Sequence, residues 1–156
     1  LCDLVGHCVG NTLCLFQFVE KHGEPLYNII NDKYKDRKVF FVYGGVSTDT
    51  REEIREIVEN ETDAIIVASY GTFSTGINIR NIDNIVFASP SKSKIRVLQS
   101  LGRGLRLGDK SKVFDLADDL TSESSRLNFT LRHFQQRLNI YDEQKFDYKI
   151  DKVKLK

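Results

Sequence analysis

Residues 64–88 read AIIVASYGTFSTGINIRNIDNIVFA, and this stretch decides the fold. The run Ala64–Ser69 is almost wholly apolar, which is typical of a strand buried on both faces. A second apolar run, Ile85–Ala88, predicts another such strand. The small and hydroxyl-bearing residues that leave the first strand predict a loop over residues 70–79. Strands buried on both faces are typical of parallel sheets, whose consecutive strands need long crossover connections.

The same alternation of strands and helices extends along the chain. Strands are predicted near residues 12–18, 38–43, 64–69, 85–88 and 112–116, and helices near residues 23–35, 48–59 and 92–105. Thr48 is the expected N-cap of the second helix. We therefore predict an α/β fold in which a parallel sheet carries helices on both faces.

The two ends of the chain receive separate predictions. The first eleven residues are expected to be the remnant of an interdomain connection, and residues 12–156 a single domain. A helix is predicted over residues 122–142, packed on the sheet. Apolar residues alternate in the tail from Gln144 to Lys156, which predicts an added edge strand.

A cluster of basic and small residues on the predicted helix near 92–105 points to phosphate chemistry. The run Gln99-Ser-Leu-Gly-Arg103-Gly-Leu-Arg106 places two arginines three residues apart, on one helical face. Arginine is always charged and offers forked donors, so the pair suits a triphosphate whose terminal phosphoryl group is being transferred. An isolated pair of this spacing would more simply be a solvated helix end, but the full Q-x-x-G-R-x-x-R pattern is much more specific.

This pattern resembles motif VI of superfamily 2 helicases, in which two arginines reach ATP held by a partner domain. The resemblance implies a RecA-like domain in which Arg103 and Arg106 are catalytic and Gln99 contacts the nucleotide. Residues 67–79 resemble motif V of the same family, which adds Gly76 and Asn78 to the nucleotide contacts. Many family members carry Asp at the latter position. Asn can still hydrogen-bond a hydroxyl, but it supplies no charge to orient an arginine.

Two glycine-containing turns are expected to contact a nucleic-acid backbone. In the motif V segment, small residues let the chain lie close to a sugar-phosphate backbone, and hydroxyl and N–H groups bind phosphate oxygens. The alternative is a plain connector between strands. The expected nucleic-acid-binding residues are Ser69, Gly71 and Thr72 of this segment and Gly44 and Gly45 after the second strand.

Further segments are similar to one group within the superfamily. Residues 67–77, 92–95, 97–103 and 143–148 resemble the UvsW-type recombination helicases of T4-like phages, and the run at 11–18 resembles motif IV of the superfamily. The likeness covers almost the whole chain but only the C-terminal motor half of such an enzyme. It implies an ATP-dependent DNA helicase that remodels branched DNA in recombination and repair, by fork regression or branch migration. It also implies an N-terminal RecA-like partner domain and a DNA strand, branched or single, along which the motor tracks.

Several expected parts of an ATPase are absent from the sequence. No G-x-x-x-x-G-K-[ST] loop and no acidic box occurs. Asp115, Asp118 and Asp119 follow an apolar run, but without a phosphate loop they are better explained as solvated residues at a strand end. We therefore expect the chain alone to be inactive, with ATP and Mg²⁺ held mainly by the missing N-terminal domain.

Composition limits the remaining alternatives. The net charge is +1, but basic residues concentrate between Arg80 and Lys112 and acidic ones between Thr48 and Asp63, so one side is expected to be positive. Three cysteines and three scattered histidines form no metal-binding pattern, and Cys14 is expected in the core. With no membrane-spanning run or signal peptide, a cytoplasmic protein is expected, in the host cell if phage-encoded. The alternatives to a motor domain are a stand-alone, non-catalytic nucleic-acid-binding module or helicase remnant, and, more remotely, a nucleotide-binding α/β protein.

Overall fold

The computed structural model describes residues 1–76, 79–89, 111–119 and 129–153. The chain divides into two compact units, Leu1–Leu116 and Ala117–Lys156. The helix predicted near residues 92–105 lies outside the described residues, as do the first residues of the helix predicted over 122–142.

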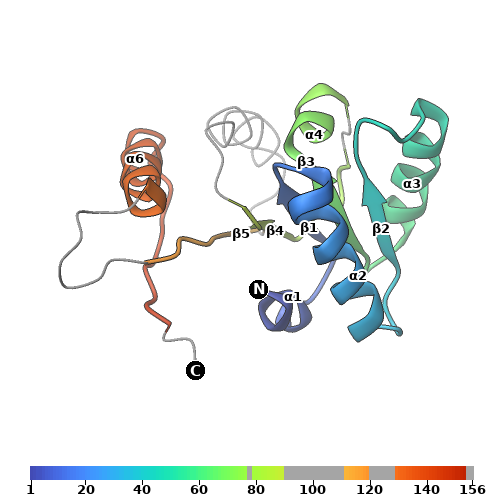
Figure 1. The fold of residues 1–156 in the computed structure, drawn as a ribbon, viewed down its shortest axis with the longest axis horizontal. Coiled ribbons are helices and arrows are strands. Elements are labelled where there is room, and N and C mark those ends of the chain that lie inside the picture. The colour runs from blue at the N-terminus through green and yellow to red at the C-terminus, as the bar shows by residue number, and fades with distance from the viewer. Residues whose placement is uncertain (77–78, 90–110, 120–128, 154–156) are drawn as a thin grey trace. The chain divides into compact units, whose positions relative to one another are not determined.

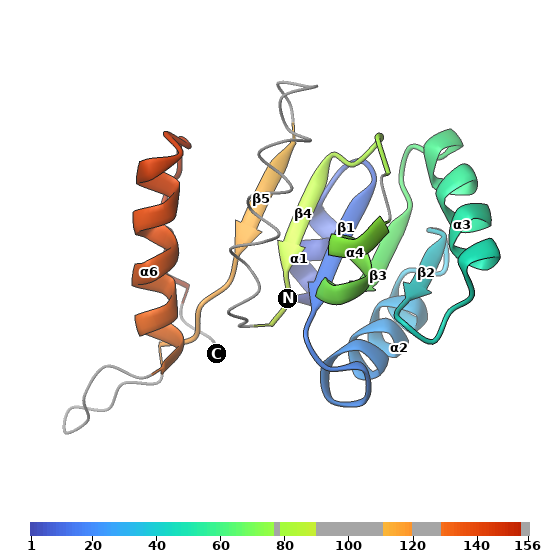
Figure 2. The same cartoon turned by 90° about the horizontal axis from the view of Figure 1, so that it is seen from above.

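A five-stranded sheet forms the centre of the first unit, with strand order β2-β3-β1-β4-β5 (Figure 1). Every neighbouring pair is parallel, and Figure 2 shows the strands side by side. The strands are β1 (Thr12–Phe16), β2 (Val39–Val42), β3 (Ile65–Ser69), β4 (Asn84–Phe87) and β5 (Lys112–Asp115). The predicted parallel α/β sheet is confirmed.

The central strands β1, β3 and β4 are buried at nearly every position, so side chains on both faces of the sheet are covered. On one face, Cys14 and Phe16 pack in a cluster with Leu26 and Ile30. The alternate residue Leu15 points to the opposite face and is also fully buried. The described residues of this unit include the helices α1 (Cys2–His7), the π-helix η1 (Val19–Gly23), α2 (Glu24–Lys33), α3 (Thr48–Asn60) and α4 (Tyr70–Gly76).

The structure corrects the predicted loop after β3. Residues 70–76 form helix α4, so the prediction of a loop over residues 70–79 is wrong for this part. Ser69 caps the helix, since its Oγ accepts a hydrogen bond from the N–H of Thr72 over 3.2 Å. Tyr70, the first residue of α4, is 2% exposed, so its ring anchors the first turn of the helix in the core. A local hydroxyl cap and a buried aromatic ring outweigh the low helix propensity of glycine and threonine in this segment.

One further boundary differs from the predictions. Ser47, rather than Thr48, is the N-cap of α3, and its Oγ accepts a hydrogen bond from the N–H of Thr50 over 3.1 Å. The first eleven residues contain helix α1, whose Val5 is fully buried in the core cluster. Cys14 is fully buried, as expected, and burial raises the pKa of its thiol.

The second unit contains helix α6 (Phe129–Glu143), which coincides with most of the predicted helix. The ring of Tyr141 lies 6.4 Å from that of Phe146 and 5.9 Å from that of Tyr148, which folds the start of the tail back on α6. Residues 146–153 form neither strand nor helix, so the predicted edge strand is absent from this described part of the tail. Alternating apolar residues make a strand only where a neighbouring strand is available to pair with them.

Candidate functional site

The carboxyl ends of β1, β3 and β4 are joined by hydrogen bonds into one continuous edge. The backbone N–H of Gln17 donates to Ser89 Oγ over 2.9 Å, and the N–H of Ala88 donates to the carbonyl of Leu15 over 2.9 Å. The hydroxyl of Tyr70 donates to the carbonyl of Ser89 over 3.0 Å. In parallel α/β sheets this edge is where ligands bind, because the connections leave it in opposite directions.

Gln17, Tyr70 and Ser89 were not singled out from the sequence as site residues. Ser89 is 4% exposed and Tyr70 2%, and the ring of Tyr70 lies 6.1 Å from that of Phe87. They hold the strand ends together rather than face a ligand. The only signal for them in the sequence is their position: Tyr70 and Ser89 directly follow predicted strands, and Gln17 lies in the last residues of another.

Two of the expected nucleic-acid-binding side chains are engaged within the protein. The hydroxyls of Ser69 and Thr72 lie 2.7 Å apart, and Thr72 is 4% exposed. These two hydroxyl groups therefore belong to the N-terminal cap of α4, in which Ser69 Oγ accepts a hydrogen bond from the N–H of Thr72. Gly71, by contrast, is exposed, and a Cβ built on it would meet no atom within 4 Å. Within this segment, the backbone at Gly71 is therefore more accessible to a ligand than the buried side chain of Thr72.

The glycine pair after β2 lies on the same edge of the sheet. β2 pairs with β3 in the register Val42↔Ala68, so Gly44–Gly45 and Ser69–Gly71 follow the carboxyl ends of adjacent strands. Both glycines are exposed, and a Cβ on Gly44 would meet nothing within 4 Å. A Cβ on Gly45 would lie 2.5 Å from the ring of Tyr43, so this turn passes the ring closely only because it has no side chain there.

The arginine part of the candidate site lies outside the described residues. This applies to Gln99, Arg103 and Arg106 and also to Asn78. Gly76 is the last residue of α4. The structure thus brings together the expected nucleic-acid contacts, and the nucleotide contacts rest on the sequence pattern.

Within residues 1–76, 79–89, 111–119 and 129–153, no three histidine, cysteine, aspartate or glutamate side chains are grouped so that they could hold a metal ion. None of the helices in the same ranges is long and apolar enough to cross a membrane.

Comparison with known proteins identifies relatives of this chain. The family model described as helicase conserved C-terminal domain matches residues 1–108. The chain is 38% identical, over 157 aligned residues, to the ATP-dependent DNA helicase uvsW of Enterobacteria phage T4. That alignment covers 93% of this chain and 31% of the phage protein, so the chain spans about a third of its relative's length.

Solved structures show the same relationship. The crystal structure of T4 UvsW matches with a TM-score of 0.73 and 37% identity, over 92% of this chain and 31% of the other. Domain 2 of the DEAD-box helicase Mss116p, solved bound to an RNA duplex, matches with a TM-score of 0.58 and 16% identity, over 70% of this chain and 43% of the other. This second likeness shows a common fold.

Proposed function

Because this chain belongs to the helicase conserved C-terminal domain family, we propose that it is the C-terminal motor domain of an ATP-dependent DNA helicase. One observation carries the proposal: a parallel sheet of this family's fold places Gly44–Gly45 and Gly71 on a single exposed edge, in a chain that also contains the motif VI pattern. The T4 relative at 38% identity supports a motor that acts on DNA, and branched DNA is the substrate we propose by likeness to it.

The nucleotide would bind between this domain and an N-terminal RecA-like domain. We assign Arg103 and Arg106 to the stabilisation of negative charge on the transferring phosphoryl group, and Gln99, Gly76 and Asn78 to nucleotide contacts. The phosphate loop and the Mg²⁺ ligands belong to the N-terminal domain, since neither pattern occurs in this sequence. Opening and closing of the cleft between the two domains would then convert hydrolysis into movement along DNA.

Because the phosphate loop and the Mg²⁺ ligands are assigned to the N-terminal domain, we predict that this chain has no ATPase activity on its own. The arginines of this domain act on a triphosphate whose phosphates and metal ion are held by another domain. Purified chain is expected to release no phosphate from ATP above the level of its Arg106→Ala variant. Activity that depends on Arg106 in the isolated chain would show that the proposed division is wrong.

A negative charge at Gly71 is expected to weaken DNA binding. We predict that Gly71→Asp lowers the affinity for single-stranded DNA about five- to tenfold, because a carboxylate a few ångströms from a phosphate in water costs about 1 kcal/mol. The fold should tolerate the change, since a Cβ at this position meets no atom within 4 Å. Fluorescence anisotropy with two unrelated labelled strands measures the effect.

The matched control is Gly71→Asn, which has nearly the same size and no charge and should bind almost normally. Both strands should lose affinity to the same extent, and the affinity should fall with added salt, because a motor contacts phosphates rather than base edges. Loss on only one sequence would instead favour a sequence-specific binding module. Equal binding by the aspartate and asparagine variants would remove Gly71 from the DNA path.

A further inference from the structure

The outer edge of the sheet at β2 is open in the described structure. β2 is the end strand and pairs with β3 alone, so one row of its backbone N–H and C=O groups faces away from the sheet. Exposed edges of this kind accept an additional strand from another chain. Among the described residues, no strand pairs with this row of backbone groups.

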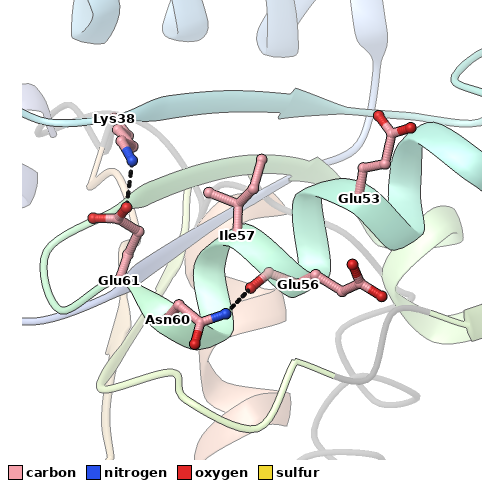
Figure 3. Close-up of a pocket in the computed structure, with 6 residues that line it drawn as sticks. All are labelled: Lys38, Glu53, Glu56, Ile57, Asn60 and Glu61. Carbon is pink, nitrogen blue, oxygen red and sulfur yellow. Dashed lines mark hydrogen bonds and ion pairs between the residues drawn. The ribbon is translucent and has the colours of Figure 1, made fainter.

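A shallow hollow of about 530 Å³ lies on the surface of helix α3, beside Lys38, the residue that precedes β2 (Figure 3). Its α3 side is formed by Glu53, Glu56, Ile57 and Asn60, which share one helical face because they are three or four residues apart. Ile57 is 41% exposed. Lys38, which directly precedes β2, forms an ion pair with Glu61, whereas Glu53 and Glu56 form no ion pair with any described residue. The hollow therefore offers an apolar side chain beside two available carboxylates.

The tail of the chain has the complementary composition. Residues 149–153 read Lys-Ile-Asp-Lys-Val, and the structure shows them without secondary structure. Ile150 is 51% exposed and Val153 81% exposed. Lys152 is exposed as well, and in an extended strand Ile150 and Lys152 lie on the same face.

We propose that residues 149–153 of a second copy of this chain add to the open edge of β2 as an extra strand, with Ile150 on Ile57 and Lys152 facing Glu53 and Glu56. The spacing fits, since side chains two residues apart on a strand are separated by roughly 6.6 Å and side chains four apart on a helix by roughly 6 Å. Each copy has one such edge and one such tail. The assembly that we propose is therefore a dimer in which the two copies exchange tails.

Sedimentation velocity of the full chain, from micromolar to hundreds of micromolar, tests this proposal. Wild type is expected to form a reversible dimer. Glu56→Lys and Lys152→Glu are each expected to weaken dimerisation at least about tenfold, because each places like charges opposite one another. The double variant Glu56→Lys/Lys152→Glu is expected to restore it. Rescue by the swapped charges cannot be explained by loss of folding.

A matched pair of isoleucines provides the control. Ile57→Asp should abolish the dimer, whereas Ile29→Asp, on α2 and 53% exposed in the wild type, should leave it unchanged. A monomer at every concentration would overturn the proposal, including the case in which the tail docks on its own chain. A dimer that survives both Glu56→Lys and Ile57→Asp would assign the contact to another surface. Neither result bears on the proposed helicase function, which rests on other residues.

Discussion

Replacing Arg106 or Arg103 by alanine in the two-domain enzyme is expected to lower ATP turnover by at least tenfold, and by as much as about a thousandfold if the residue acts as an arginine finger. The interaction that is lost belongs to the transition state, in which charge develops on the transferring phosphoryl group. DNA affinity should therefore remain nearly normal. Steady-state phosphate release with saturating DNA, together with a DNA-binding isotherm, measures both quantities.

Two further variants make this prediction specific. Arg106→Lys should also fail, because an ammonium group keeps the charge but cannot reproduce the planar fork of donors. Arg80→Ala is the control, since Arg80 is an exposed arginine outside the motif and its loss should leave turnover unchanged. Near-normal turnover in both alanine variants would mean that the motif VI assignment of residues 99–106 is wrong.

The largest expected effect on stability is at Asn11. Its side chain is fully buried, and its Nδ2 lies 3.1 Å from the carbonyl oxygen of Val58, 2.7 Å from that of Glu61 and 2.9 Å from that of Asn81. Its Oδ1 accepts a hydrogen bond from the N–H of Ala64 over 2.8 Å. One amide group thus ties the start of β1 to the end of α3, the start of β3 and the segment before β4.

Asn11→Ala is expected to lower the free energy of unfolding by about 3–5 kcal/mol, because several buried backbone groups lose their partner at once. Urea unfolding followed by circular dichroism measures the change. Asn81→Ala is the matched control. Asn81 is exposed and its side chain makes one described hydrogen bond, to the carbonyl of Glu61, so its loss should cost about 1 kcal/mol or less. Equal effects at the two positions would show that the buried network contributes little.

The prediction of strands from the sequence succeeded because the signal is local. The run at 64–69 is apolar at nearly every position, short, and rich in β-branched residues. These features favour a strand covered on both faces, so β3 could be predicted from composition. The prediction of a strand in the tail was wrong because it used the local pattern alone. Its apolar alternation is as regular as that of a strand, but a strand also needs a partner, which the pattern does not specify.

The sequence singled out the residues of the candidate site but not the direction of their side chains. Gly44, Gly45 and Gly71 were identified from the sequence, and the structure places them on one exposed edge. Thr72 was expected to meet a phosphate, yet its side chain is buried against Ser69. A hydroxyl in a glycine-rich segment suits a phosphate contact and a helix cap equally well, and local sequence does not distinguish the two.

By itself, then, the sequence determined the parallel α/β fold, the family and the residues to test for chemistry, because apolar runs and motif spacing are properties of neighbouring residues. Tertiary structure alone decided which polar side chains are used internally. Asn11 appears in the sequence only as the first residue of a motif IV-like run, and its partners at Val58, Glu61 and Asn81 lie 47 to 70 residues away. A buried amide is satisfied by whatever carbonyls the fold brings to it, and that arrangement exists only after the chain has closed around it.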